Sequence, residues 1–256
     1  MNIDISIPNS WSKLSQRQLK SVFSFMSSES LSLHQCKLLL AFKFAGIKFY
    51  GLHPEGALVR CDGVFCYLDE DDLLAIAHEM DFIEEDPQIP VRLFEIKHRK
   101  AVHPLLRDLS FAKWLAIENL YYGFLETKDV ALLNEVLSIL YPKSGKFSAF
   151  VKTFKSRKID FSHINAIKWL SSFKKYLERR YPEIYKRINP DSSVAGSSIS
   201  QKKLLESMNA QIRALTKGDI TKNEAVLDMD LHSALIELDA LALEARKLNE
   251  SLKKKK

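Results

Sequence analysis

At 256 residues the chain is long enough for one large domain or two smaller ones, and its 46% hydrophobic and 27% charged residues are typical of a globular protein. Only 8 glycines and 8 prolines are present, which argues against sandwiches, propellers and glycine-rich phosphate loops and favours helices with short connections. The net charge of +6 hides a segregation: residues 69–86 hold nine acids and no Lys or Arg, whereas residues 143–190 hold thirteen Lys or Arg and three acids.

The chain shows no targeting or membrane signal. No run approaches the roughly 18 apolar residues that a membrane-spanning helix needs. The first residues lack the basic and then apolar profile of a signal peptide. Three cysteines are an odd set and do not build a disulfide framework. We therefore expect no membrane association and a location in the reducing cytoplasm, with residence inside a larger assembly equally allowed.

Two helices are predicted near the N-terminus. Ser15 and Gln18 suit a capping box at the start of a helix that runs to about Met26. A second helix is expected over residues 33–45, where Gly46 follows as a left-handed cap.

Extended segments are predicted on either side of these helices. Residues 2–7 alternate isoleucines with other residues, as a strand does. Within residues 47–68, Asp62-Gly63 stands between two β-rich runs, which is the strongest short hairpin signal in the chain. The proline-limited residues 87–96 are at best an edge strand.

Five further helices are predicted between the sheet and residue 181. The acids at Asp69 to Asp72 suit a helix start, because acids stabilise the positive end of the helix dipole. Ser110 is the expected cap of a later helix, and Pro182 ends the last one. The helical ranges are 69–80, 110–127, 128–142, 147–155 and 161–181.

Composition divides the chain into three parts. Residues 188–200 are rich in Pro, Gly and Ser, which is typical of a flexible linker. A mainly helical N-terminal domain with a small sheet is predicted over residues 1–187, and a C-terminal amphipathic helical hairpin with a basic tail over residues 201–256. The predicted fold class is therefore mainly α: a helical domain with a small N-terminal β-sheet or hairpin, plus a C-terminal helical hairpin module.

The C-terminal part carries an apolar face that needs a partner. Thr221 and Glu224 are interpreted as a second capping box rather than as a catalytic base and nucleophile. After them, apolar residues recur at heptad spacing from residue 231 to residue 252. Two such helices bury little surface alone, so they either dock on the N-terminal domain or receive a partner helix in a groove. The candidate partner-binding residues are Leu231, Leu238, Leu241 and Leu248.

No pattern in the sequence indicates a catalytic, cofactor or metal site. Nucleotide-binding glycine loops and Gly-x-Ser-x-Gly are absent. Cys61 and Cys66 lack the spacing of a zinc ribbon and are interpreted as strand residues. His98 and His103 are interpreted as surface residues, and the acids of residues 69–86 as a solvated face without EF-hand spacing. A Ser-His-Asp or Cys-His set from distant positions stays open, but we expect no enzyme.

A second hypothesis concerns the basic stretch between residues 143 and 187. Its aromatic residues could stack on bases while Lys and Arg contact phosphates. The aromatic spacing is helical, which favours a helix core on one face and Lys and Arg on the other. The nucleic-acid candidates are Lys152, Lys155, Arg157, Lys158, Lys174, Lys175, Arg179 and Arg180.

The order of segments resembles proteins from the tail-gene region of tailed phages and prophages, some of them similar to tail assembly chaperones. The segments that carry the resemblance are IPNSWSKLSQRQL, LLLAFKFAGIKF, LSFAKWLAIENLYYGFLETKD, LLNEVLSILYP, NAIKWLSSFKKYLERRYPEIY and AQIRALTKGDITKNEAVLDMDLHSALIEL. The resemblance implies a non-enzymatic cytoplasmic helper that binds a long helical tail protein, such as one of tape-measure type, or else a minor virion component. It implies no catalytic residues and no cofactor.

Overall fold

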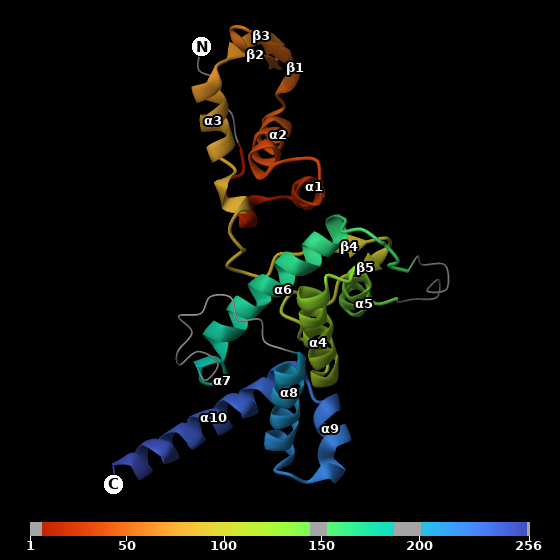
Figure 1. Cartoon of the computed structure of the whole chain (residues 1–256), viewed down its shortest axis with the longest axis vertical. Helices are drawn as coiled ribbons and strands as arrows, with labels where there is room; N and C mark the ends of the chain where they lie inside the picture. The colour runs from red at the N-terminus through yellow and green to blue at the C-terminus, as the bar shows by residue number, and fades with distance from the viewer. Residues whose placement is uncertain (1–6, 144–152, 187–200, 255–256) are drawn as a thin grey trace. The chain divides into compact units, whose positions relative to one another are not determined.

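The computed structural model describes residues 7–143, 153–186 and 201–254, and within them the chain is mainly helical with a small N-terminal three-stranded antiparallel sheet (Figure 1). This confirms the predicted fold class. Contacts divide the chain into two compact units. The first unit comprises residues 1–87, 91–94 and 159–169, and the second comprises residues 88–90, 95–158 and 170–256.

The first unit consists of helices α1 to α3, strands β1 to β3 and the first half of α6. Their bounds are Gln16–Met26 for α1, Leu33–Ala45 for α2, Lys48–His53 for β1, Gly56–Cys61 for β2, Val64–Leu68 for β3, Glu70–His78 for α3 and Phe161–Arg180 for the whole of α6. Short 3-10 turns lie at Trp11–Lys13 and Asp81–Ile83.

Local caps determine where these helices begin and end. Ser15 begins α1 with the predicted capping box to Gln18. Asp69 begins α3 in the same way, with Asp72 as its partner. Gly46 ends α2 in the left-handed region at φ 72°. The predicted bounds of α1 and α2 are therefore confirmed.

The sheet has the order β1-β2-β3 and packs its inner face on α2 and α3. Asp62 and Gly63, at φ 47° and 88°, make the turn between β2 and β3 and confirm the predicted hairpin. A register shift between Phe49 and Gly51 places a bulge at Tyr50. The buried cluster beneath the sheet consists of Phe42, Ile47, Ala57, Val59 and Cys61.

Gly56 is the position of the sheet where a side chain fits least well. Its φ is 124°, and an added Cβ would lie 2.3 Å from the backbone oxygen of Leu68. Gly46 is the control, because its φ is 72° but an added Cβ would meet no atom within 4 Å. We expect Gly46→Ala to lower the free energy of unfolding by about 1–2 kcal/mol, and Gly56→Ala to lower it by more. Urea denaturation of both variants measures the difference, and equal losses would contradict the close approach at Gly56.

The second unit consists of β4 and β5, α4 and α5, the second half of α6, and α7 to α10. Their bounds are Glu95–Ile96 for β4, Arg99–Lys100 for β5, Phe111–Thr127 for α4, Val130–Leu140 for α5, Pro182–Lys186 for α7, Gln201–Thr216 for α8, Asn223–Asp228 for α9 and Leu231–Lys253 for α10. A 3-10 turn at Ile220–Lys222 links α8 to α9. The rings of Trp114 and Phe173, both fully buried, lie 5.3 Å apart and join α4 to α6.

The two units defined by contacts differ from the domains predicted from composition. Helices α8, α9 and α10 all contact α4, so the C-terminal helices belong to the same unit as residues 95–158 (Figure 1). The apolar face of the C-terminal part is therefore covered in part by its own chain. The predicted linker at residues 188–200 lies outside the described residues.

Two predicted helix caps are corrected by the structure. Thr221 and Glu224 form no capping box: the Thr221 hydroxyl donates to Asp219, which caps the 3-10 turn instead. Ser110 precedes α4 as predicted, but its side chain makes no capping hydrogen bond, and it forms a β-bridge to Asp230.

The segment before α6 is a further correction. A helix was predicted over residues 147–155, but residues 153–155 are not helical, and residues 144–152 lie outside the described residues. Phe154 is buried against the Tyr141 ring at 6.3 Å, and this contact holds the segment in an irregular conformation. Of residues 87–96, only β4 forms a strand, paired with β5. Residues 2–6 of the predicted extended segment also lie outside the described residues.

Candidate functional site

The predicted partner-binding leucines divide into two groups along α10. Leu231 and Leu238 are buried, at 0% and 7% exposed, whereas Leu248 is 61% exposed. Leu241 is half-buried and lines a groove. The first half of the apolar face therefore packs within the chain, and the second half remains open to a partner.

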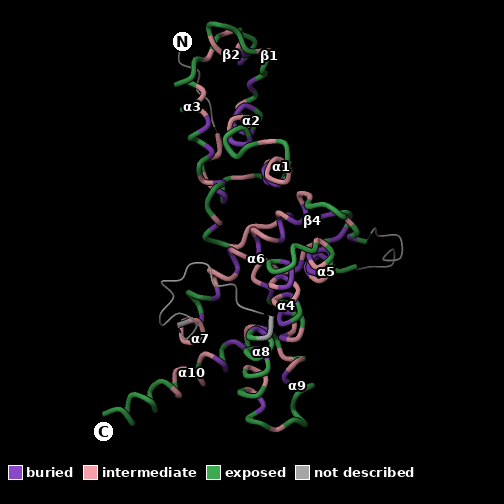
Figure 2. Tube along the Cα trace, viewed as in Figure 1, coloured by how far each residue is buried: buried purple, intermediate pink, exposed green. Residues whose placement is uncertain are grey.

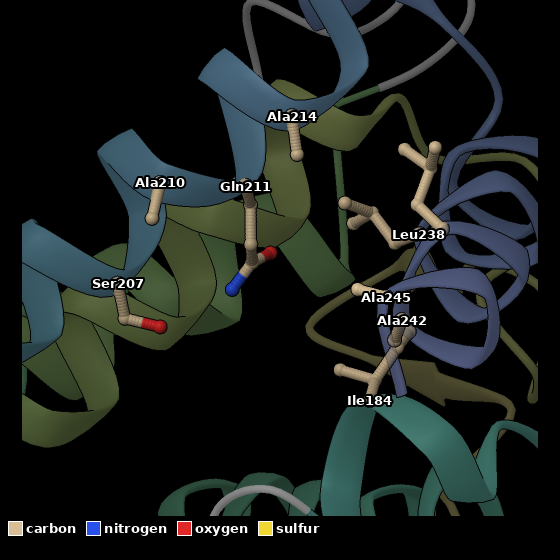
Figure 3. A pocket seen from close by; sticks show the side chains of 9 residues that line it. Ile184, Ser207, Ala210, Gln211, Ala214, Leu238, Ala242 and Ala245 are labelled. Atoms are coloured by element: carbon tan, nitrogen blue, oxygen red, sulfur yellow. The ribbon is translucent and has the colours of Figure 1, made fainter. Parts of the chain in front are cut away.

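The groove lies between α8 and α10 and has a volume of about 390 Å³ (Figure 3). Most of the side chains that line it are small. They are Ser207, Ala210, Gln211 and Ala214 from α8, Leu238, Leu241, Ala242 and Ala245 from α10, and Ile184 from α7. Small side chains on facing helices let the backbone of a third helix approach closely.

Polar contacts to α7 hold one wall of the groove. The Asp239 carboxylate of α10 accepts from the backbone N–H groups of Glu183 and Ile184, at 2.8 and 3.1 Å. About two turns further along α10, Arg246 Nε lies 3.1 Å from the Glu183 carboxylate. An acid accepting at the first N–H groups of a short helix is favourable, because those donors have no intrahelical partner. These contacts fix α10 next to Ile184.

Hydrogen bonds of His232 and of the main chain hold the N-terminal end of α10 in place. His232 Nε2 donates to the backbone oxygen of Leu105 at 2.6 Å, so Nδ1 is left to accept from the Tyr181 hydroxyl at 2.7 Å. Leu231 N donates to Leu109 O, and Phe111 N donates to Met229 O. Sequence reasoning missed this network, since its members are far apart in the chain and none stands in a motif.

The second half of α10 is exposed. No residue of α10 after Leu238 is buried, and Leu248 and Leu252 are 61% and 55% exposed (Figure 2). Lys247, Lys253 and Lys254 surround them and are also exposed. The groove thus continues into an apolar stripe with basic neighbours.

A polar cavity of about 340 Å³ adjoins the groove, and both are lined by Ile184, Ser207 and Gln211. Burial raises the pKa of the Glu118 carboxyl in this cavity, and Lys174 partly offsets the effect. Lys174 Nζ lies 3.8 Å from Glu118 Oε1 and 4.1 Å from the centre of the Tyr122 ring.

The predicted nucleic-acid residues do not share one face. Lys152 lies outside the described residues. Lys155, Arg157 and Lys158 are exposed in the segment before α6, as are Arg179 and Arg180 near the end of α6, whereas Lys174 and Lys175 are half-buried. Because successive helical residues rotate by about 100°, the basic residues of α6 point in several directions, and Lys174 contacts α4.

Four aromatic residues of this stretch lie in the core. Trp169 and Phe173 are fully buried, and Phe154 and Tyr181 are 5% and 4% exposed. The interpretation as core residues is confirmed for these four, which present no face on which a base could stack. Phe161 and Tyr176 are half-buried, and Phe147 and Phe150 lie outside the described residues.

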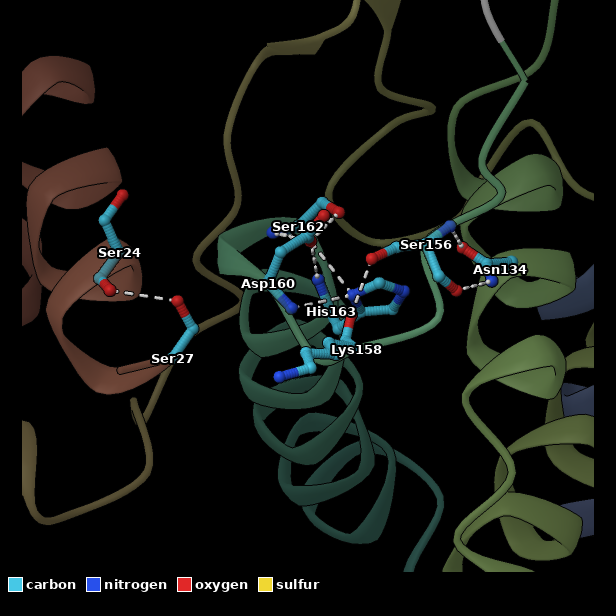
Figure 4. A network of polar contacts seen from close by, with 8 residues as sticks. All are labelled: Ser24, Ser27, Asn134, Ser156, Lys158, Asp160, Ser162 and His163. Carbon is cyan, nitrogen blue, oxygen red and sulfur yellow. Dashed lines mark hydrogen bonds and ion pairs between the residues drawn. The ribbon is translucent and has the colours of Figure 1, made fainter. Parts of the chain in front are cut away.

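Asp160, Ser162 and His163 superficially resemble a catalytic triad, but their hydrogen bonds are those of a helix start (Figure 4). The Asp160 carboxylate accepts from the backbone and hydroxyl of Ser162. His163 Nδ1 lies 2.9 Å from Asp160 Oδ1 and 3.0 Å from Asp160 N, so it donates to the carboxylate when protonated and accepts from the backbone when neutral. The Ser162 hydroxyl contacts the carboxylate, not the imidazole, which is the wrong order for a nucleophile and its base.

The segment before this triad-like group is held from α5. Asn134 accepts from Ser156 N and donates to Ser156 O, and the Ser156 hydroxyl donates to Lys158 O (Figure 4). The basic segment of residues 155–158 is therefore fixed at its backbone while its charged ends are exposed.

The Asp160 cap predicts a pH dependence of stability. Burial alone would raise the pKa of the carboxyl, but hydrogen bonds from His163 and Ser162 outweigh it and hold the pKa well below its usual range. Because the folded pKa is lower than the unfolded one, this contribution is present above about pH 4 and is lost as pH falls further. We expect the unfolding free energy of the Asp160→Asn variant to fall less steeply between roughly pH 5 and pH 2 than that of the unaltered chain. Urea denaturation across this range tests it, and parallel curves would refute the role of the carboxylate.

The predicted metal-site alternatives find no support in the described part of the chain, where no group of three or more His, Cys, Asp or Glu side chains could hold an ion. Cys61 and Cys66 are strand residues on the inner face of the sheet, as predicted. Burial is the largest cause that raises the pKa of the Cys61 thiol, which keeps it protonated. His98 is at the exposed β4–β5 turn, and His103 Nδ1 accepts from Leu105 N.

Comparison with known proteins assigns the chain to no family. No family model matches the chain, and neither the curated proteins nor the solved structures contain a match. Among the helices of the described residues, none is both long and apolar enough to cross a membrane.

Proposed function

We propose that this chain is a non-enzymatic, chaperone-like tail-assembly protein of a phage or prophage, and that it binds an α-helix of a partner protein in the groove between α8 and α10. The observation that carries the proposal is the groove itself, with its small side chains and its continuation along the exposed half of α10. The phage context rests on the resemblance of the segments described above.

A helix is the occupant that this groove fits best. The walls are two helices whose alanines and serine leave room for a third helix to pack at close distance. Beyond the groove, Leu248 and Leu252 lie 4 residues apart on one face of α10. Apolar residues at this spacing pack against the side chains of a partner helix, as in a coiled coil. A partner helix with apolar residues at a and d positions would cover both parts in one contact.

Charge specifies the partner further. Around the apolar stripe the exposed lysines Lys247, Lys253 and Lys254 outnumber the exposed acid Glu250, whereas Arg246 is paired with Glu183. A helix that carries Asp or Glu where it passes the end of α10 would be attracted, and a basic one repelled. A long helical tail protein of tape-measure type, bound in the host cytoplasm during assembly, is the client that we propose.

The two rival functions predict different behaviour. A minor virion component would remain in purified particles. A nucleic-acid-binding protein would use the exposed Lys155, Arg157, Lys158, Arg179 and Arg180 for phosphate contacts, and its affinity for duplex DNA would fall by about 0.9 log units per log unit of salt for each phosphate contacted.

Affinity purification of the tagged full chain from its native cells, with and without nuclease, tests the proposal. We expect a helix-rich phage protein to co-purify, to survive nuclease and to be absent from purifications of an unrelated tagged control. Partners that disappear on nuclease treatment, together with steep salt dependence, would favour nucleic-acid binding and contradict the proposal.

A further inference from the structure

The outer face of the three-stranded sheet, opposite the buried cluster, carries exposed aromatic side chains. Tyr50, Phe65 and Tyr67 are 51%, 55% and 45% exposed. The His53 ring is also exposed and lies beside that of Tyr67. Large rings that gather on one face and remain this exposed mark an interaction surface.

The register of the sheet places these rings on one face. Arg60 pairs with Phe65 and Leu58 pairs with Tyr67, and paired residues of antiparallel strands share a face. Along β2, Leu58 and Arg60 alternate with residues of the buried cluster, so they point outward. The bulge at Tyr50 turns its ring to the same side, where it contacts the ring of Phe65.

The rings form two pairs that follow each other along the sheet. The centres of the Tyr50 and Phe65 rings are 5.1 Å apart, and those of His53 and Tyr67 are 5.7 Å apart. Phe65 and Tyr67 are two residues apart on β3, which corresponds to about 7 Å along the strand. An extended ligand with planar groups can therefore place successive groups on successive pairs.

The charges on the outer face are positive. Lys48 and Arg60 are exposed and pair across β1 and β2, and the Arg60 guanidinium lies 5.5 Å from the centre of the Phe65 ring. The three strands contain no Asp or Glu, and Glu55 and Asp62 lie in the turns. Within the described part of the chain, neither Lys48 nor Arg60 forms an ion pair. Cations beside exposed rings attract an anionic ligand.

The acids of α3 lie on the other side of the sheet. Leu73 and Ile76 of α3 pack against the buried cluster, so this helix lies beneath the inner face. The cations are also at the opposite end of β3. Arg60 pairs with Phe65 near the β2–β3 turn, whereas α3 follows the far end of β3 at Leu68. The acids are thus separated from the outer face by the sheet itself.

We propose that the outer face of this sheet binds a single strand of DNA or RNA. Bases stack on the two aromatic pairs, and Lys48 and Arg60 contact the phosphates. A duplex does not fit, because its bases are stacked on one another and offer no free ring face. The surface lies in the first unit, so it is a second interaction site, separate from the helix groove of the second unit.

Fluorescence anisotropy of the full chain with labelled oligonucleotides tests the proposal. The probes are oligo-dT, oligo-U and a duplex of the same length, and their affinities also distinguish DNA from RNA as the ligand. We expect at least one single strand to bind, and the duplex to bind more weakly by about tenfold or more. Equal binding of the duplex, or binding of anionic phospholipid vesicles in place of either single strand, would overturn the proposal.

Substitutions of one ring separate stacking from apolar contact. Phe65→Leu keeps an apolar side chain but removes the ring, and it should weaken the single strand by about fivefold or more. Phe65→Tyr keeps the ring and should bind like the unaltered chain. Leu52→Ser is the control on the inner face: Leu52 is 79% exposed, and binding should not change. Circular dichroism verifies that each variant is folded. Unchanged binding by Phe65→Leu, or equal losses with Leu52→Ser, would contradict stacking on the outer face.

The salt dependence locates the phosphate contacts. For single strands, each phosphate contact contributes about 0.7 to the slope of log affinity against log salt. The double variant Lys48→Gln/Arg60→Gln should therefore reduce the slope by about 1.4. The triple variant Lys155→Gln/Arg157→Gln/Lys158→Gln, in the second unit, should leave the slope and the affinity unchanged. The opposite pattern would place nucleic-acid binding in the second unit and refute the site on the sheet.

Discussion

Replacing Leu231 by alanine is expected to lower the free energy of unfolding of the second unit by about 2–5 kcal/mol. Leu231 is fully buried at the start of α10, and removing a buried leucine side chain costs the lost transfer energy plus the cavity left behind. Leu248→Ala is the matched control from the same apolar stripe. At 61% exposed, its loss should change the unfolding free energy by no more than about 0.5 kcal/mol.

Chemical denaturation monitored by tryptophan fluorescence compares the two variants, since Trp114 lies in the core of the same unit. A large difference between two leucines that the sequence alone treats as equivalent is the result expected from the packing of α10 on its own chain. Similar losses at both positions would mean that the second half of α10 is covered as well.

Filling the groove should abolish binding of the helical partner without unfolding the chain. Ala245→Trp places a large side chain between α8 and α10, where a partner helix must approach. We expect recovery of the partner in quantitative affinity purification to fall as its affinity drops by more than about 2 kcal/mol, or roughly thirtyfold. The thermal unfolding midpoint should stay close to that of the unaltered chain.

Ala240→Trp provides the control for this change. Ala240 is exposed on the same helix but does not line the groove. Its replacement introduces the same side chain with the same helix propensity, so the partner should still be recovered. Loss of the partner with both variants would indicate that α10 as a whole is sensitive, and the groove would not be the site.

Features determined by neighbours in sequence could be predicted. The capping box at Ser15 and Gln18, the glycine cap at Gly46 and the Asp62-Gly63 turn each depend on a few adjacent residues. Their positions, and with them the mainly helical class with a small sheet, follow from the sequence alone.

Features determined by distant residues could not. The heptad spacing of α10 shows that one face is apolar but not what covers it, and the contact of Asp239 with Glu183 and Ile184 joins residues more than 50 positions apart. The capping box predicted at Thr221 was wrong for a local reason, because its hydroxyl donates to Asp219 two residues earlier. Phe154 has helical spacing to its neighbours, but burial against Tyr141 prevails.

The candidate site was predicted in part. Leucines of the apolar stripe were identified, and Leu238 and Leu241 do line the groove. The alanines and the serine that make room for a partner carry no signal of their own, because such residues are common in any helix. Only the placement of α8 opposite α10 shows that they face a shared space.

The most direct test of the helix-binding groove is site-specific photo-crosslinking in the native cells, with a photoreactive phenylalanine derivative at Ala245 and, in a parallel strain, at Ala240. Mass spectrometry of the products identifies the crosslinked peptide. The account predicts that position 245 crosslinks to one helical segment of a tail protein, with acids near its contact with the end of α10, and that position 240 does not. Crosslinks from position 245 to the chain itself alone, or equal crosslinking of the same partner at both positions, would contradict it.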